Sequence, residues 1–322
     1  MSKSIKSTPC ALSAPDRSNG VQWLTVGAAA EGQRIDNFLH RHLRGVPRSH
    51  IYRLLRSGQV RINGGRIRAH YRLRSGDRLR LPPVRTATPR SGPSPPPGLM
   101  RRVVAAVLRE DAHFMFLDKP GGVPVHGGTG NPWGIIELLS RYRPELTQLS
   151  LAHRLDRETS GVLVLAKHRR ALLGFQDALR HGEVVKVYQA LLAGNVTEDR
   201  WRVSMSLARR RGEVRVDTGG KPAVSEFAVL RHLDGATLVR VRLHTGRMHQ
   251  IRVHAAHSGH PVLGDPRYGD FAANRAWRRR GLRRLFLHAE RLAFDWDGSH
   301  YEIRTPLPPE LDAVVQTAEG AP

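Results

Sequence analysis

Three features are scarce in this sequence: cysteine, long apolar runs and acidic residues. Cys10 is the only cysteine, which excludes an internal disulfide and a zinc site built on cysteines. No stretch of about 18 apolar residues is present to span a bilayer, and the first residues lack the apolar core of a signal peptide. We therefore expect a soluble, cytoplasmic protein that does not associate with membranes.

The shortage of acidic residues leaves the chain strongly basic. Its 322 residues include 52 Lys and Arg against 28 Asp and Glu, which gives a formal net charge of +24. Such a charge predicts a polyanionic partner, with nucleic acid the leading class and lipid headgroups the rival class. The length favours one catalytic-sized domain together with a small accessory domain.

Composition divides the chain into four segments. Residues 1–20 are rich in Ser, Lys, Pro and Ala without apolar periodicity, which predicts a disordered basic arm. Residues 21–83 form a small domain, and residues 84–100 form a Pro-rich, semi-rigid linker. Residues 101–318 alternate short apolar runs with helical patterns, which predicts a larger domain that mixes helices and strands.

The small domain shows two apolar sets at helical spacing and then a short alternating pattern. The helical sets are Ile35, Phe38, Leu39 and Leu43, then Ile51, Leu54 and Leu55, with a stop at Gly58. After them Val60 and Ile62 alternate with polar residues, Asn63-Gly64 is a hairpin turn signal, and Leu79 and Leu81 alternate with arginines. The pattern predicts two helices followed by a small sheet.

Arginines dominate the exposed positions of this domain. Residues 34–90 contain 15 arginines, with Asp36 and Asp77 as the only acids. A solvated surface would normally mix charges of both signs, so we interpret the face as an RNA-binding surface, with Arg48, Arg53 and Arg56 as candidates. The strings Arg34-Ile-Asp-Asn-Phe-Leu39 and Ser57-Gly-Gln-Val-Arg-Ile-Asn-Gly64 resemble the S4 RNA-binding module.

A glycine-rich segment of the larger domain runs from Leu117 to Gly130 and contains Lys119-Pro120 and His126. Its glycines allow the backbone to approach a ligand closely, although an irregular loop is an equal alternative. No Gly-Lys-Ser or Gly-Lys-Thr string follows it, which argues against a nucleoside triphosphate site.

A second segment, His153-Arg154-Leu-Asp156-Arg-Glu-Thr-Ser160-Gly, leads directly into the apolar run 162–166. Cations flank the Asp156 carboxylate, and such neighbours favour the ionised form that a nucleophile or base requires. A structural ion pair would use the same residues, and spacing alone favours this structural interpretation. No Gly-x-Ser-x-Gly string is present, so Ser160 is interpreted as a turn residue.

A third segment contains five histidines between His244 and His260, together with Arg247 and Arg252. A metal site is disfavoured, because His-Glu-x-x-His is missing, no acid occurs before Asp265, and the arginines would repel a cation. We interpret the segment as a cationic surface at the start of a helix that binds phosphates or an anionic side chain. Lys186 and Tyr188 head an apolar run and form a further candidate, although such a tyrosine is usually a core residue.

Taken in order, these segments resemble the RluA family of pseudouridine synthases, in the branch with an S4 module that modifies large-subunit ribosomal RNA, the RluC type. The most specific part is His153-Arg-Leu-Asp156 followed by Thr159-Ser-Gly161. Further matches are Lys119-Pro120, Val125-His-Gly-Gly128, Lys186-Val-Tyr188, Gly246-Arg-Met-His-Gln-Ile-Arg252, Asp265-Pro-Arg-Tyr-Gly269 and Leu285-Phe-Leu-His-Ala289. Asp118 and Ala152 depart mildly from the family pattern.

The resemblance implies an enzyme that converts uridine to pseudouridine without a cofactor or a metal. It implies that Asp156 is the catalytic carboxylate, that Arg252 pairs with it, and that Tyr188 stacks on the base and takes part in removing the C5 proton. Arg154 would fill or brace the gap left by the flipped base. His126, Lys186 and Arg247 are expected to bind the RNA.

The expected fold is therefore α+β, with an S4 module and a catalytic domain built on a mainly antiparallel mixed sheet. The expected partner is large-subunit ribosomal RNA or its assembly intermediate, and the expected oligomeric state is a monomer. Two alternatives stay open: a sister synthase with another ribosomal RNA site, and a non-catalytic RNA-binding assembly factor. A pure binder has no need of a carboxylate inside a cationic loop, so Asp156 distinguishes the last alternative.

Overall fold

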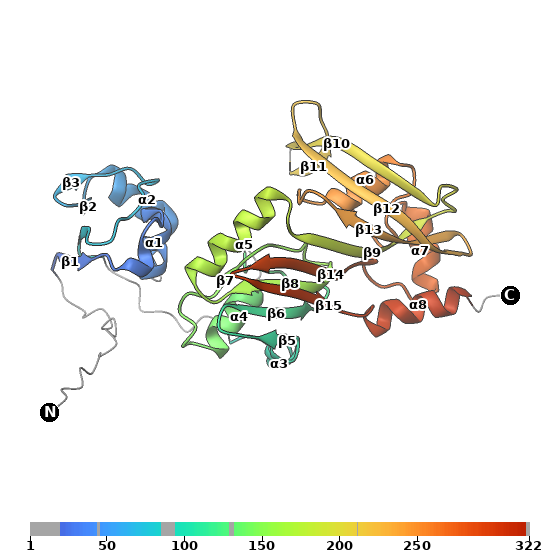
Figure 1. Ribbon diagram of the computed structural model, residues 1–322, viewed down its shortest axis with the longest axis horizontal. Helices are drawn as coiled ribbons and strands as arrows, with labels where there is room; N and C mark the ends of the chain where they lie inside the picture. Colours follow the sequence, from blue (N-terminus) through green and yellow to red (C-terminus); the bar gives the residue numbers. More distant parts are fainter. Residues whose placement is uncertain (1–19, 44–45, 85–93, 129–131, 211, 320–322) are drawn as a thin grey trace. The chain divides into compact units, whose positions relative to one another are not determined.

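The computed structural model describes residues 20–43, 46–84, 94–128, 132–210 and 212–319 (Figure 1). The chain divides into two compact units, residues 1–94 and residues 95–322, each with its own hydrophobic core. Among the described residues no helix is long and apolar enough to cross a membrane.

The first unit packs two helices against a four-stranded antiparallel sheet of order β1-β4-β2-β3. Its elements are β1 (Gln22–Thr25), the 3-10 helix η1 (Ala28–Ala30), α1 (Ile35–His42), α2 (Arg48–Arg56), β2 (Arg61–Ile62), β3 (Gly65–Arg66) and β4 (Arg78–Leu81). The apolar positions that predicted the two helices, among them Ile35, Leu39, Ile51 and Leu54, are buried together in one core. The helical spacing of these residues is thus explained by a shared buried face.

The predicted hairpin turn is confirmed by the backbone. Asn63 and Gly64 have φ values of 50° and 82°, and both signs are positive as a tight hairpin turn between twisted strands requires. The sequence patterns did not reveal β1, which is four residues long, half exposed, and joined to β4 through the pairing of Trp23 with Arg80.

The predicted linker, residues 84–100, extends too far at its C-terminal end. Residues 85–93 lie outside the described part of the chain, but α3 (Pro97–Ala105) already begins at Pro97. Proline suits the first turn of a helix, because its missing N–H would have no partner there and its fixed φ is already helical. A proline in this segment therefore marks a helix start rather than more linker.

The second unit is built on an 11-stranded mixed sheet whose main path has the order β11-β10-β12-β13-β9-β14-β8-β6-β5, with β15 beside β14 and β7 beside β8. Among the described strands only β8 and β14 pair in parallel. The strands are β5 (Val107–Glu110), β6 (Phe114–Lys119), β7 (Ser150–Leu151), β8 (Ser160–Ala166), β9 (Val185–Ala193), β10 (Arg200–Arg210), β11 (Glu213–Val216), β12 (Lys221–Leu233), β13 (Ala236–Leu243), β14 (Leu287–Trp296) and β15 (Ser299–Arg304).

Helices cover both faces of this sheet, and the alternation of side chains along each strand separates the two cores. On one face α3, α4 (Ile135–Tyr142) and α6 (Gln250–His257) pack on residues such as Leu117, Leu163 and Tyr188. On the other face α5 (Arg169–His181), α7 (Phe271–Arg279) and α8 (Pro309–Glu319) pack on residues such as Phe116 and Leu191. The predicted α+β class and the mainly antiparallel sheet are confirmed.

Candidate active site

The three predicted catalytic residues meet on the sheet face covered by α6. Asp156 lies in the loop between β7 and β8, Tyr188 points from β9, and Arg252 lies in the first turn of α6. Together with Arg154 and Arg247 they line a single pocket, whose floor is apolar. Segments separated by up to 96 residues in the sequence thus form one site.

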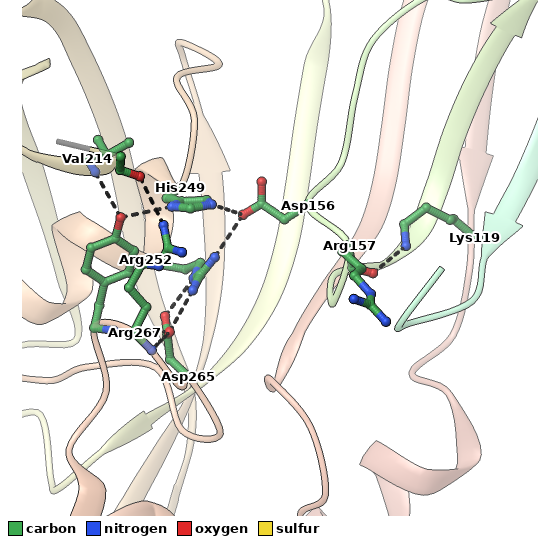
Figure 2. Close-up of polar contacts among 10 residues, drawn as sticks. Lys119, Asp156, Arg157, Val214, His249, Arg252, Asp265 and Arg267 are labelled. Atoms are coloured by element: carbon green, nitrogen blue, oxygen red, sulfur yellow. Dashed lines mark hydrogen bonds and ion pairs between the residues drawn. The ribbon is translucent and has the colours of Figure 1, made fainter. Parts of the chain in front are cut away.

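The loop that carries Asp156 is fixed by a buried lysine. Lys119, which is fully buried at the end of β6, donates from Nζ to the carbonyl oxygens of Pro120, Val123 and Arg157 at 2.9, 2.9 and 3.0 Å. Figure 2 shows the contact with Arg157. The last of these carbonyls follows Asp156 directly. A buried ammonium with three backbone acceptors satisfies its hydrogen bonds and ties the glycine-rich segment to the Asp156 loop.

Gly161 lets the loop pass into the sheet. Its φ is +108°, and a Cβ at this position would lie 2.2 Å from the carbonyl oxygen of Ala289 in β14. This is the place where β8 and β14 pair in parallel. Only glycine permits both the backbone angle and the close approach of the two strands, which explains its place in the sequence string that follows Asp156.

A chain of charges holds the Asp156 carboxylate. Arg252 donates from Nη1 to Asp156 Oδ2 at 3.3 Å, and from Nε and Nη2 to the two carboxylate oxygens of Asp265 at 2.6 and 2.7 Å. The side chain of Asp265 is fully buried, that of Arg252 is 8% exposed, and that of Asp156 is 19% exposed. Figure 2 shows Arg252 between the two carboxylates. The bidentate pair fixes the guanidinium plane, so the third nitrogen is aimed at Asp156.

The Asp265 carboxylate is itself well satisfied. Burial alone would raise its pKa, but the Arg252 guanidinium and the backbone N–H groups of Arg267 and Tyr268 lower the pKa of Asp265 below its usual range. Asp265 therefore stays ionised and holds Arg252 in place. The stability of this buried ion pair depends on both residues, because either one without the other would be an uncompensated buried charge.

His249 approaches Asp156 from the other side. Its Nε2 lies 3.8 Å from Asp156 Oδ2, and its Nδ1 lies 2.9 Å from the Tyr268 hydroxyl (Figure 2). The same hydroxyl accepts the N–H of Val214 at 3.1 Å, so its own proton is directed to Nδ1 of His249. The proton of a neutral imidazole then lies on Nε2, facing Asp156. Burial lowers the pKa of His249, which favours this neutral form.

Tyr188 stays protonated near Asp156. Burial, followed by the nearby Asp156 carboxylate, raises the pKa of the Tyr188 hydroxyl well above its usual range. A phenol in this setting is a poor base at neutral pH. Its aromatic ring, however, forms part of the pocket wall and is positioned for contact with a planar ligand.

The remaining predicted residues differ in their surroundings. Arg154 is exposed at the rim of the pocket, and Arg247 donates from Nε to the carbonyl of Pro222 at 3.1 Å. Lys186 is buried on β9, where burial and then the charge of Arg247 lower its pKa to about 8, and it does not line the pocket. His126 also lies outside the pocket: it is 65% exposed and 3.6 Å from Glu137.

The arginine candidates of the first unit lie on α2. Arg53 and Arg56 are exposed, and Arg53 contacts His50, whereas the side chain of Arg48 lies outside the described residues. The two acids between residues 34 and 90 are buried, and Asp36 accepts hydrogen bonds from Arg34 and Tyr52. Asp77 likewise accepts from Asn63 and Tyr71. The two carboxylates therefore support the fold, and the exposed face of α2 stays cationic.

Four residues of the site received no role from the sequence patterns. They are Lys119, His249, Asp265 and Tyr268. All four lie in sequence strings that carry the family resemblance, and this resemblance is the signal that could have identified them. Their burial and their mutual contacts depend on the fold. Ser160, interpreted as a turn residue, is instead the first residue of β8, and its Oγ contacts His288 at 3.0 Å.

The histidines of the 244–260 segment have partners other than a metal. His244 lies 3.0 Å from Glu226, His249 contacts Tyr268, and Nδ1 of His254 contacts the Ser225 hydroxyl. Within the part of the chain that the structure describes, no three His, Cys, Asp or Glu side chains gather as a metal site requires.

The chain is similar to known proteins along most of its length. The family model described as RNA pseudouridylate synthase matches residues 113–257, which include Asp156, Tyr188 and Arg252. A ribosomal large subunit pseudouridine synthase C of Salmonella typhi is 45% identical over 297 residues, covering 89% of this chain and 93% of the relative. The protein of the same name in Vibrio vulnificus (strain CMCP6) is 41% identical over 303 residues, covering 92% and 96%.

The chain belongs to the RNA pseudouridine synthase family. It is an isomerase of the type that carries an S4 domain, because the S4 family model matches residues 33–79. Two solved structures share the synthase fold. Human RNA Pseudouridylate Synthase Domain Containing 4 gives a TM-score of 0.58 at 25% identity, covering 69% of this chain and 96% of that chain. Human RNA Pseudouridylate Synthase Domain Containing 1 gives 0.55 at 27% identity, covering 67% and 95%.

Proposed function

We propose that this synthase isomerises specific uridines of large-subunit ribosomal RNA to pseudouridine, with Asp156 as the catalytic carboxylate. The observation that supports this most directly is the position of Asp156 in the pocket, 3.3 Å from an arginine that a second, fully buried carboxylate holds in place. The substrate class follows the printed names of the relatives that match most of the chain. The protein would act as a monomer in the cytoplasm on free RNA or on an assembly intermediate.

The chemistry needs one carboxylate and no cofactor. The N1–C1′ glycosidic bond of uridine breaks, the uracil turns, and a C5–C1′ bond forms. The proton at C5 is then lost to a base and N1 gains a proton, so the product is an isomer of the substrate. Asp156 can start this sequence by attacking C1′ or by removing the 2′ proton, and either role requires the ionised form. Arg252 donates a hydrogen bond to Asp156 Oδ2 at 3.3 Å and orients the carboxylate, and Nε2 of His249 lies 3.8 Å from the same oxygen.

The detached uracil must be held while it turns. Tyr188 provides an aromatic wall beside Asp156, and its hydroxyl stays protonated, so we assign it to stacking on the base rather than to an initial proton abstraction. The target uridine must leave the RNA stack to reach this pocket, at a cost of a few kcal/mol. Arg154, exposed at the rim, is placed to brace the gap that the flipped base leaves.

The cationic surfaces provide the binding free energy for this step. Arg53 and Arg56 on α2, with Arg48 at its start, would bind phosphates through the S4 unit, and Arg247 would do so at the pocket. Lys186 and His126 have weaker support as RNA ligands, because Lys186 is buried and His126 faces Glu137.

The test is to map pseudouridines in large-subunit ribosomal RNA that lacks them, after incubation with the purified protein, by carbodiimide modification and primer extension. New stops at defined uridines would support the proposal and identify the sites. If RNA is bound but no stops appear on naked RNA or on ribosomal subunits, the protein is a binding factor and the proposal fails. Stops only in small-subunit or transfer RNA would retain the reaction and overturn the substrate class.

A further inference from the structure

The residues that follow the active-site turn form a second cationic surface. Between Asp270 and Glu290 the sequence contains six arginines and no acid. Part of this stretch is α7, a nine-residue helix that begins directly after Asp270, whose carboxylate accepts the N–H groups of Ala272 and Ala273. Helix α7 lies near α8 (Figure 1), and both pack on the sheet face opposite to α6.

The helix has one buried side and one charged side. Trp277 is buried against α8 and the sheet, with Ala273 packed beside it. At 100° per residue, Phe271, Arg275, Arg278 and Arg279 fall on the opposite side. All four are exposed, and Phe271 is 63% exposed, which is the highest value among the exposed large apolar residues described. The outward side of α7 is therefore a surface of three guanidinium groups and one aromatic ring.

These arginines have no carboxylate partner among the described residues, unlike several other arginines of the catalytic unit. Arg170, Arg180 and Arg304 are paired with Asp297, Asp177 and Glu302, whereas no ion pair joins Arg275, Arg278 or Arg279 to a described residue. Even within the same stretch, Arg280 pairs with Asp234 and Arg284 with Glu310. Three adjacent cations without carboxylates are unfavourable by themselves and fit an anionic partner.

The surface is joined to the active site by a short series of contacts. Asn274 of α7 donates to the carbonyl of Asp265 at 2.9 Å and accepts the N–H of Gly264 at 2.7 Å. Asp265 holds Arg252, and Arg252 contacts Asp156. Because α7 packs on the sheet face opposite to the pocket, its outward side can be reached only by RNA that extends past the edge of the sheet, beyond the nucleotides next to the target uridine.

We propose that the outward side of α7 binds a part of the substrate RNA that lies beyond the pocket, with Arg275, Arg278 and Arg279 on phosphates and Phe271 stacked on an unpaired base. Arginine matches phosphate geometry, and an exposed aromatic ring beside arginines is the usual arrangement for single-stranded RNA. This inference rests on the proposed function only in taking RNA as the partner. It assigns a binding surface on the catalytic unit that is separate from the S4 unit and from the pocket.

The experiment compares two triple variants in an Asp156→Asn background, so that turnover does not affect the binding measurement. One carries R275Q, R278Q and R279Q; the control carries R170Q, R180Q and R304Q, which removes the same charge from arginines that have carboxylate partners. Binding to a transcript of the modified rRNA region is measured by filter retention at several KCl concentrations. We expect the α7 triple to raise Kd by roughly tenfold or more and to reduce the salt slope by about two, with little change in the control. Phe271→Ala should raise Kd by roughly fivefold without a change of slope.

Equal losses in the two triples would show a general charge effect and overturn the proposal. The proposal would also be overturned if the α7 triple bound naked RNA normally but bound ribosomal subunits more weakly. The partner of the α7 surface would then be a protein. If the wild type forms no pseudouridine but the α7 triple still loses RNA affinity, the proposed function fails and the α7 surface stands. Melting temperatures of all variants establish that each is folded.

Discussion

Arg252 contacts two carboxylates at once, Asp156 through Nη1 at 3.3 Å and Asp265 through Nε and Nη2 at 2.6 and 2.7 Å. The shorter, bidentate pair joins Arg252 to the fully buried Asp265. The longer contact joins Arg252 to Asp156, which reaches the pocket. Asp265 thus positions the arginine, while Asp156 stays free to act on a substrate. The division of roles between the two carboxylates leads to a first prediction.

Asp265→Asn should reduce kcat far more than it changes RNA affinity. The amide cannot balance the charge of Arg252, whose guanidinium would turn toward Asp156 or away from it, and a displacement of about 1 Å at a reacting group can cost about 100-fold in rate. Removal of one member of a buried pair should also lower the free energy of unfolding by about 3 kcal/mol. Tritium release from RNA labelled at uridine C5 gives kcat, and urea unfolding gives the stability. Asp295→Asn, at an 83% exposed side chain, is the control, and equal effects in the two variants would contradict this account.

Tyr268→Phe tests the tautomer assigned to His249. The variant keeps the ring under the Arg252 guanidinium, 5.1 Å from its centroid, but removes the hydroxyl that directs a proton to Nδ1. His249 could then carry its proton on either nitrogen, and its ring would lose the hydrogen bond that orients it beside Asp156. We expect kcat to fall by roughly fivefold, about the value of one hydrogen bond, with KM unchanged. A rise in KM alone would assign Tyr268 to RNA binding instead.

Substitutions at Tyr188 separate stacking from proton transfer. Because its pKa is raised and the hydroxyl is protonated, Tyr188→Phe should leave KM within about twofold and should not remove a limb of the pH profile between about pH 6 and 9. Tyr188→Leu removes the ring and should raise KM by roughly tenfold, in line with the value of one stacked base. Equal KM values for the Phe and Leu variants would exclude the stacking role.

Two buried histidines predict how stability depends on pH. Burial lowers the pKa of His254 and of His288 to about 4, and both side chains are fully buried. The unfolded chain binds these protons near pH 6.5, so between about pH 6.5 and 4 it holds more protons than the folded chain. Stability should therefore fall with falling pH in this window, by about 1.4 kcal/mol per pH unit for each histidine. Urea unfolding of wild type and His254→Asn at several pH values measures this slope, and an identical slope in both proteins would contradict the assignment.

Much of the site was predictable as a set of sequence strings, but its geometry was not. The hairpin at Asn63-Gly64 and the two helices predicted around Leu39 and Leu54 follow from local rules, and all three are present. The pairing of Asp156 with Arg252 joins positions 96 residues apart, and only the family resemblance anticipated it.

Buried charges were the part that local rules could not supply. Lys119 and Asp265 are fully buried, although lysine and aspartate are normally exposed unless paired. Their partners are carbonyls and a guanidinium brought together by the long sheet, so no window of sequence contains the reason for their burial. The C-terminal end of the linker was predicted wrongly although a local rule was available. Pro97 follows the rule that proline suits the first turn of a helix, but the proline-rich composition around it indicates a linker.

The most direct test of the account is a single-turnover comparison of wild type and Asp156→Asn on the same ribosomal RNA transcript, with pseudouridine quantified by mass spectrometry and RNA affinity measured in parallel. Because the amide keeps the shape of the side chain but can neither attack C1′ nor remove a proton, we expect the rate to fall by at least about 1,000-fold while Kd stays within about twofold. An Asp156→Asn protein that forms pseudouridine at a rate near that of the wild type would contradict the assignment of this carboxylate as the catalytic group.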